Sequence, residues 1–201
     1  MPRLYLMRHG QTEFNLAKRV QGRCDSPLTP LGVEQARSAA RWLAGQDVAF
    51  DTMCASPLGR TRATIDVVRG VLNGDRSTAL PPIEFMPGLI ERSYGIYESG
   101  LQADVPADLW DPGEDLVADG GEGSAAVCAR MVDTLTRVML RPNAETVLAV
   151  SHGSATLQFK QAWEHLAECP QDVPLGNCCV LVYRFNPRDR TFICENIVNQ
   201  A

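Results

Sequence analysis

Short apolar runs that alternate with longer stretches of helical pattern constrain the fold of this 201-residue chain more than any other feature. The runs are brief and carry few charges, which is typical of strands buried on both faces of a sheet. We expect strands at residues 4–7, 52–55, 146–150, 180–185 and 191–194, and a further one at 82–86. This order predicts an α/β fold, a three-layer sandwich with a mostly parallel central sheet and helices on both faces.

The stretches between the apolar runs carry the boundary marks of helices. Thr29 is a suitable N-cap, Pro30 follows at the first helical position, and Gly45 is placed to end this helix. Ser56 and Pro57 would open a second helix in the same way. We expect two further helices, one from about 124 to 140 and one that begins after residue 153 and ends before 170.

Residues 95–123 show neither a short apolar run typical of a strand nor the spacing of apolar residues typical of a helix. They are rich in Pro, Gly and acidic residues, and a short helix is expected only near 104–110. We interpret this segment as an insertion that forms a lid or a wall over a ligand site, because long loops in compact domains are commonly functional. The whole chain, 1–201, would then form one domain, as its length allows.

Charge and cysteine content narrow the expected partners and the compartment. The net charge of −5 gives no broad basic field, so we expect no nucleic-acid partner. No apolar run reaches the length of a membrane span, so we expect no membrane partner. The seven cysteines are odd in number and form no CxxC pair, which indicates neither a disulfide framework nor a metal site. We therefore expect a cytoplasmic, metal-free protein, with its oligomeric state left open and a homodimer possible.

Cations and imidazoles follow several of the expected strands. Arg8 and His9 come directly after the first strand. Arg60 lies in the first turn of the helix after the second, and His152 follows the strand at 146–150. Because the carboxyl ends of parallel strands line one crevice, these four side chains should converge beside helix N-termini that favour an anion. The chain contains no GxxxxGK[ST] motif, so the sequence predicts a phosphate pocket without a P-loop.

These residues lie within longer sequence blocks, which span most of residues 4–153. The blocks are residues 8–15, 21–22, 25–29, 32, 35–36, 56–60, 64, 89–95 and 151–153. In this order and spacing they resemble the histidine phosphatase, or phosphoglycerate mutase-like, superfamily. An Arg-His-Gly motif alone would arise by chance in roughly one per cent of chains of this size, whereas the joint occurrence of the blocks is specific.

The resemblance implies a metal-independent phosphomonoester hydrolase with His9 as the nucleophile that forms a phosphohistidine. One ring nitrogen of His9 must then be bare, so its other N–H should be held by a backbone carbonyl such as that of the Gly10 loop. Arg8 and Arg60 would clamp the phosphoryl oxygens, and His152 would complete the clamp. These side chains would position the phosphoryl group and balance its charge, so no cofactor is expected.

Glu91 matches the block of the family's general acid. The resemblance implies that Glu91 gives a proton to the leaving oxygen and later accepts one. The alternative is that Glu91 only pairs with the adjacent Arg92 in a solvated ion pair of small value.

A second group of residues would contact the substrate or order its loops. Thr12 and Asn15 would serve as secondary phosphate or loop-ordering contacts, and Gly10 would let the backbone approach the phosphate closely. Arg62 lies close enough to Arg60 to compete with it. The expected substrate-binding set is Gly10, Thr12, Asn15, Gln21, Gly22, Arg62 and Gly153.

The sequence bears on the choice between phosphatase and mutase in opposing ways. Residues 91–95 resemble the mutase form of their block, whereas residues 25–29 are similar to the phosphatase branch. Residues 93–129 contain eight acidic residues and neither Lys nor Arg, so we expect an acidic wall that repels a second anionic group. The predicted substrate is therefore a small phosphorylated metabolite whose remaining part is neutral, apolar or cationic.

Two alternatives stay open. Lys18, Arg19 and Arg23 could supply cations from the other rim, so a phosphoglycerate mutase that depends on 2,3-bisphosphoglycerate is the second candidate. The third is a catalytically inactive phosphoester-binding module. Such a relative would be expected to lose the nucleophile, a clamp arginine or the acid, and this chain retains all of them.

Overall fold

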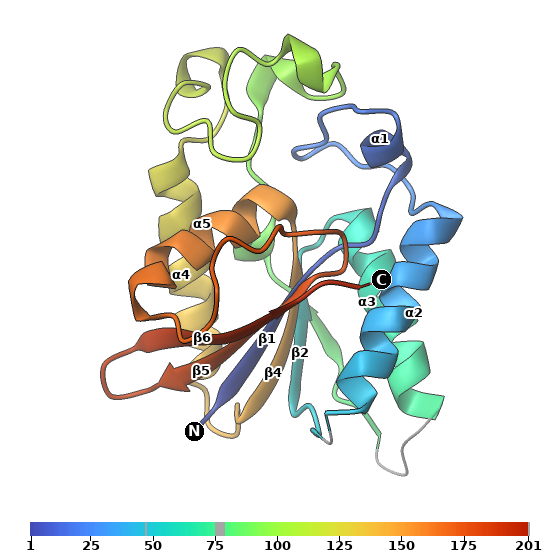
Figure 1. Ribbon diagram of the computed structural model, residues 1–201, viewed down its shortest axis with the longest axis vertical. Coiled ribbons are helices and arrows are strands. Elements are labelled where there is room, and N and C mark those ends of the chain that lie inside the picture. Colours follow the sequence, from blue (N-terminus) through green and yellow to red (C-terminus); the bar gives the residue numbers. More distant parts are fainter. Residues whose placement is uncertain (47, 75–78, 201) are drawn as a thin grey trace.

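The computed structural model describes residues 1–46, 48–74 and 79–200, and strands and helices alternate along them as expected (Figure 1). The strands are β1 (Arg3–Arg8), β2 (Thr52–Ala55), β3 (Ile83–Phe85), β4 (Thr146–Ser151), β5 (Val180–Asn186) and β6 (Thr191–Val198). The α-helices are α1 (Glu13–Leu16), α2 (Pro30–Ala44), α3 (Gly59–Gly74), α4 (Ser124–Met139) and α5 (Gly153–Trp163). All expected strands are present, and the last one runs four residues beyond its predicted end at Cys194.

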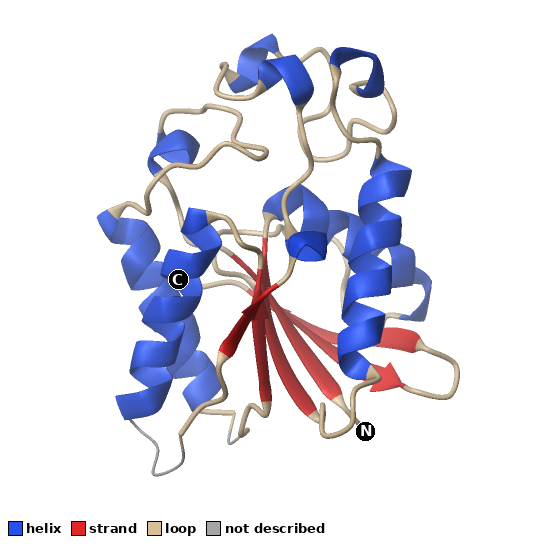
Figure 2. Ribbon diagram, turned by 180° about the vertical axis from the view of Figure 1, so that it is seen from behind, coloured by secondary structure: helices blue, strands red, loops and turns tan. Residues whose placement is uncertain are grey.

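The strands form one sheet in the order β3-β2-β4-β1-β5-β6. The first four in this order run parallel to one another, and β5 pairs antiparallel with both β1 and β6. Figure 2 shows helices on both sides of the sheet. The predicted sandwich with a mostly parallel sheet is confirmed.

Successive residues of each strand point into two different cores. Leu4 and Leu6 of β1 pack with the apolar faces of α4 and α5, whereas Tyr5 and Met7 pack with those of α2 and α3. This follows from the period of two along a strand. Because both faces are covered, the strands at the centre are apolar throughout, and the ends of the strands are left for chemistry.

The predicted start of α2 is confirmed, whereas the start of α3 differs. Thr29 caps α2, since its Oγ1 accepts a hydrogen bond from the Gly32 N–H at 3.0 Å. Helix α3 begins at Gly59 rather than at Ser56 and Pro57, and its first N–H groups donate to the carboxylate of Asp25. The cap of α3 is distant in sequence, so the residues next to the helix do not reveal it.

Residues 95–123 lie above the carboxyl ends of the strands (Figure 1). This segment holds three 3₁₀ turns, at Gly95–Tyr97, Gln102–Asp104 and Val117–Asp119, and the short helix expected near 104–110 is absent from it. Pro106 disfavours a helical conformation at the residue before it. The Asp108 carboxylate accepts hydrogen bonds from the N–H groups of Trp110 and Asp111, at 2.8 and 3.4 Å. Local side-chain hydrogen bonds thus replace helical ones.

The described helices include none that is both long enough and apolar enough to cross a bilayer.

Candidate active site

His9 directly follows β1 and is only 2% exposed. Its Nδ1 lies 2.8 Å from the carbonyl oxygen of Gly10, so the Nδ1–H donates to that carbonyl. The proton on Nδ1 leaves Nε2 unprotonated, with its lone pair able to accept a hydrogen bond or to bond to phosphorus. The structure therefore holds His9 in the tautomer that a nucleophilic imidazole requires, through the carbonyl that the sequence suggested.

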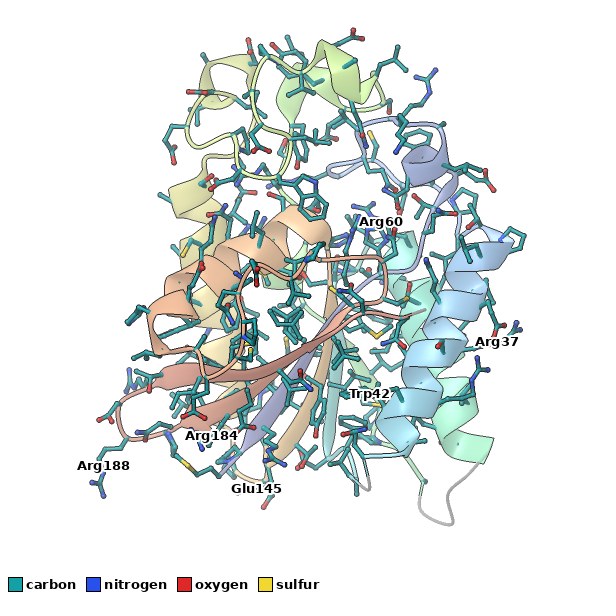
Figure 3. The ribbon with its side chains drawn as sticks, viewed as in Figure 1. Arg37, Trp42, Arg60, Glu145, Arg184 and Arg188 are labelled. Carbon is teal, nitrogen blue, oxygen red and sulfur yellow. The ribbon has the colours of Figure 1, made fainter. Side chains whose placement is uncertain are left out.

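Arg60 joins the two histidines. Its Nε lies 3.3 Å from Nε2 of His9 and 3.1 Å from Nδ1 of His152, and the two imidazole centroids are 5.3 Å apart. Because Nδ1 of His152 accepts from Arg60, its Nε2–H donates to the Ser56 hydroxyl at 2.7 Å. Figure 3 shows Arg60 at the carboxyl end of the sheet, opposite Glu145 at the amino end. The expected convergence of distant segments at one end of the sheet is observed.

Both imidazoles are kept neutral by their surroundings. Burial lowers the pKa of His9 well below its usual value, and the positive charge of Arg60 lowers it further. The pKa of His152 is lowered in the same way, first by burial and then by Arg60. A neutral His9 retains the Nε2 lone pair that its predicted role as a nucleophile requires.

We expect the imidazoles of His9 and His152 to stay neutral as the pH falls through 6.5, the usual pKa of histidine. A lowered pKa means that each ring takes up a proton only at a more acidic pH. In an NMR titration of the ligand-free protein, the ring carbon and proton signals of both residues should stay constant between pH 7.5 and about 6. A titration step near pH 6.5 at either ring would contradict this expectation.

Arg60 is anchored by the loop that precedes α2. Its Nη2 donates to the carbonyl of Gly22 at 2.6 Å, and its Nη1 donates to the carbonyl of Cys24 at 2.7 Å and to Oδ1 of Asp25 at 3.1 Å. The Arg60 side chain is fully buried, so these acceptors supply the compensation that a buried cation needs. The guanidinium is thereby fixed before any ligand arrives.

Replacing Asp25 by alanine should weaken both α3 and the hold on Arg60. The Asp25 carboxylate caps the helix and accepts from the Arg60 guanidinium. We expect the free energy of unfolding to fall by about 1 kcal/mol, the usual cost of a lost cap. Urea unfolding measures this loss, and Asp66→Ala at an exposed position of α3 is the matched control. Equal stability of the two variants would contradict the role of Asp25.

Arg8, at the end of β1, lies beside the histidines. Its Nη1 donates to the carbonyl of Leu175 at 2.7 Å, and its guanidinium carbon lies 4.8 Å from the ring centroid of Trp110. A guanidinium stacked on an indole gains a cation–π attraction. Trp110 belongs to the 95–123 segment, so this contact joins that segment to the predicted phosphate clamp.

Glu91 is held at the N-terminus of α5. Its Oε1 accepts from the N–H groups of Arg92 and Ala155, both at 2.9 Å, and its Oε2 accepts from the N–H of Ser154 at 3.2 Å. The helix dipole favours a carboxylate at this position. The Arg92 guanidinium donates instead to Ser154, Ser124 and the carbonyl of Glu122, so the alternative of a solvated Glu91–Arg92 pair is wrong.

These groups border one cavity of about 310 Å³. The members of the predicted set that line it are Arg8, His9, Asn15, Gln21, Gly22, Arg60, Glu91 and Gly153. His152 is fully buried behind this surface and contacts it through Arg60. Within the described parts of the chain, no three His, Cys, Asp or Glu side chains are grouped to hold a metal ion.

Three predicted substrate-binding residues do not line the cavity. Thr12 caps α1, with its Oγ1 accepting from the Asn15 N–H at 3.2 Å, so its placement fits the loop-ordering alternative. Gly10 is small for a different reason than expected, because a side chain there would collide with the carbonyl of Gly32 rather than with a ligand.

Arg62 is the third of these residues, and its prediction requires correction. Its guanidinium lies 3.8 Å from the ring centroid of Phe85, and its Nε donates to the carbonyl of Pro57 at 2.8 Å. Two positions along a helix project in nearly opposite directions. Arg60 therefore points into the site, whereas Arg62 points outward.

The expected acidic wall is also wrong. Among the described residues that line the cavity, Glu91 is the single acid. The acids of the 95–123 segment turn elsewhere: Glu98 accepts from backbone N–H groups of the 23–24 loop, Asp111 accepts from Ser124, and Glu122 pairs with Arg130. Acidic residues in turns commonly cap backbone N–H groups, a role that a charge count does not reveal.

The cavity rim is cationic instead. Lys18 and Arg19 line it, and Nη1 of Arg19 also donates to the carbonyl of Ser99 at 2.6 Å. Arg23, the third cation considered on this rim, pairs with Glu122 at 3.6 Å. From the sequence, Lys18 and Arg19 are expected on the other rim of the site. In the structure, both line the same cavity as Arg8 and Arg60.

Sequence reasoning missed several residues of the site. The sequence offers a signal for some of them, since Asp25 and Ser56 lie inside the family blocks. Asn177 has no such signal. Its Nδ2 donates to the carbonyl of His9 at 3.1 Å, which links the segment before β5 to the loop after β1.

Comparison with known proteins decides the family. Residues 4–198 match the model of the histidine phosphatase superfamily (branch 1). The chain belongs to this superfamily. Among the relatives of this superfamily member, a 2,3-bisphosphoglycerate-dependent phosphoglycerate mutase of Rhizobium etli is 33% identical over 83% of this chain and 82% of the mutase. A broad-specificity phosphatase of Saccharomyces cerevisiae is 29% identical over 98% of this chain and 85% of the phosphatase.

Solved structures agree with the family assignment. The YhfR protein of Bacillus stearothermophilus superposes on this histidine phosphatase superfamily member with a TM-score of 0.78 at 27% identity. The match covers 96% of this chain and 94% of the other. The resemblance drawn from the sequence blocks is confirmed, and the superfamily relatives of this chain include both phosphatases and mutases.

Proposed function

We propose that this protein hydrolyses small phosphomonoesters through a phosphohistidine on Nε2 of His9. One observation carries the proposal: Nε of Arg60 lies within 3.3 Å of His9 Nε2 and 3.1 Å of His152 Nδ1, in a site whose cavity Arg8 and Glu91 border. A phosphoryl group seated there would meet a nucleophile, two guanidinium groups and an acid at once. Its charge would be balanced by groups that are already oriented, which is what phosphoryl transfer chiefly requires.

The reaction would run in two displacements. In the first, His9 Nε2 forms a bond to phosphorus, the bond to the ester oxygen breaks, and Glu91, which enters this step in its protonated form, gives its proton to the departing alkoxide. In the second, water forms a bond to phosphorus, the bond between phosphorus and His9 Nε2 breaks, Glu91 accepts the water proton, and inorganic phosphate leaves. Arg8 and Arg60 would stabilise the equatorial oxygens in both steps. The proton that Glu91 gives to the alkoxide is replaced by the one that it accepts from water, so the scheme needs no cofactor.

Glu91→Gln should slow hydrolysis most for esters with poor leaving groups. A glutamine keeps the size of the side chain but cannot deliver a proton, so the loss should be roughly 10²- to 10³-fold for alkyl phosphates and about tenfold or less for p-nitrophenyl phosphate. The ratio of the two kcat/KM values in wild type and variant measures this. Equal slowing across leaving groups would remove Glu91 from the role of proton donor.

The experiment that tests the proposal is hydrolysis of p-nitrophenyl phosphate in EDTA, together with trapping of the phosphoenzyme. We expect turnover in EDTA and an acid-labile phosphoryl group on His9. Absence of turnover and of phosphoenzyme would favour a phosphoester-binding module instead.

A mutase is the second candidate, and the cationic rim favours it. Lys18 and Arg19 line the cavity and would accept a second anionic group, such as a carboxylate or another phosphate. The mutase of Rhizobium etli is among the relatives at 33% identity. Interconversion of phosphoglycerates that requires 2,3-bisphosphoglycerate would show that the protein is a mutase rather than a hydrolase.

A further inference from the structure

A second cavity, of about 540 Å³, adjoins the phosphate cavity. Arg8 and Trp110 border both. The stacked pair of guanidinium and indole, 4.8 Å apart, therefore forms the partition between them. The second cavity lies between α5 and residues 171–176, and nothing in the reaction scheme above uses it.

The walls of this cavity are mostly apolar, and their charged residues are Arg8, Lys160 and the exposed Asp172. Leu157 of α5 faces Val173 and Leu175 across the space. Lys160 also lines it and is only 5% exposed. Its Nζ lies 3.6 Å from a carboxylate oxygen of Glu164, a side chain that is 48% exposed, so the pair is longer than a direct hydrogen bond and partly solvated. The Lys160 side chain is mostly buried and its ammonium has only this partly solvated partner, so it would favour an incoming anionic oxygen.

Two further residues of the lining carry unsatisfied polar atoms. Nε of Arg8 and Oε1 of Gln171 are buried and have no hydrogen-bond partner within the described residues. Buried polar atoms are rarely left without a partner in folded proteins. Arg8 borders both cavities, so its Nε is a donor for a ligand that spans them, and Oε1 of Gln171 is an acceptor in the second cavity that the described residues do not satisfy.

One face of α5 connects the two cavities. Gly153 lines the phosphate cavity, and Leu157 and Lys160 line the second one, at intervals of four and three residues along the same face. A side chain at Gly153 would contact Trp110, so the glycine lets the indole lie on the helix start. Seven residues of helix correspond to roughly 10 Å, a distance that an extended chain of about eight bonds spans.

We propose that the second cavity binds the organic part of the substrate, whose distal anionic group pairs with Lys160. The inference rests on the proposed function, because it seats the phosphoryl group at His9. The substrate class is then a phosphomonoester of an extended, mainly apolar hydroxy acid. The Arg8–Trp110 partition would contact the chain where it passes from one cavity to the other.

Three esters test the proposal: p-nitrophenyl phosphate, hexyl phosphate and the phosphate ester of 6-hydroxyhexanoic acid. In the wild type we expect kcat/KM for the carboxylated ester to exceed that for hexyl phosphate by about tenfold, the contribution of one charge-assisted contact. Lys160→Met should abolish that advantage and leave p-nitrophenyl phosphate within about twofold of wild type. Val173→Trp, which fills the cavity, should lower kcat/KM for both chain esters about tenfold with the same small effect on p-nitrophenyl phosphate.

Lys18→Met is the matched control, because it removes a cation from the rim of the first cavity. If Lys18→Met rather than Lys160→Met abolishes the advantage of the carboxylated ester, the distal group binds at the first rim and the proposal is overturned. A wild type without any preference for the carboxylated ester also overturns it. Thermal melting verifies that each variant is folded.

A separate measurement keeps the proposal independent of catalysis. If no ester is hydrolysed, p-nitrophenyl phosphate included, the proposed function has failed rather than the cavity. Calorimetric binding of 7-phosphonoheptanoate, which cannot be hydrolysed, then decides. About tenfold weaker binding by Lys160→Met supports the second cavity as a ligand site, and equal binding by wild type and variant overturns it.

Discussion

Replacing His9 by alanine is expected to abolish phosphomonoester hydrolysis, with a loss of roughly 10⁴-fold or more in kcat. The variant has no nitrogen at the position of Nε2, and the lone pair of that unprotonated atom is the nucleophile of the proposed reaction. Water attacking the bound ester directly would gain only the charge stabilisation of the remaining cage. Release of p-nitrophenol and release of inorganic phosphate measure the two displacements, and acid-labile labelling of the protein detects the phosphohistidine between them.

The control for this variant is His165→Ala. His165 lies in the exposed 3₁₀ turn after α5, Glu164–Leu166, and does not line the cavity. It should retain wild-type turnover and labelling. His9→Ala should still bind substrate, since Arg8 and Arg60 remain, so lost turnover with retained binding separates catalysis from misfolding. Persistent labelling of His9→Ala would place the phosphoryl group on another residue.

Most of the fold could be predicted because its determinants are local. The brief apolar runs become the six strands, and the Thr29 cap with Pro30 starts α2 where expected. The strand ends could be combined into one site because parallel strands bring their carboxyl ends together. His9 and His152 lie far apart in the chain, yet β1 and β4 pair side by side and carry them to one place.

The errors arose where a contact joins segments that the sequence does not show to be neighbours. Asp25 caps α3 from another part of the chain, so the helix start was misplaced. The acids of 95–123 turn to backbone N–H groups and to Arg130. A count of their charges therefore predicts a negatively charged pocket wall, whereas Lys18 and Arg19 give the rim of the pocket a positive charge. Side-chain direction depends on these long-range partners, and a composition argument has no access to them.

Arg60→Lys should lower kcat/KM by roughly 10³-fold, although the charge is kept. A lysine has one ammonium in place of a planar fork. It cannot contact His9 and His152 through one nitrogen while it donates to the carbonyls of Gly22 and Cys24 through two others. The loop at residues 22–24 would lose its anchor, and the phosphoryl oxygens would lose a fixed donor.

The same substitution two positions further along the helix provides the comparison that isolates this effect. Arg62→Lys makes an identical chemical change on α3, but Arg62 is exposed and stacks on Phe85, so kcat/KM should stay within about twofold of wild type. If both variants lost activity equally, the loss would reflect the helix rather than the guanidinium in the site. Suppose instead that only Arg60→Lys loses activity, and that its melting temperature is close to that of Arg62→Lys. The activity then depends on the forked guanidinium donor of Arg60. Such a result would distinguish a positioned phosphate clamp from a general positive field, which a lysine would reproduce.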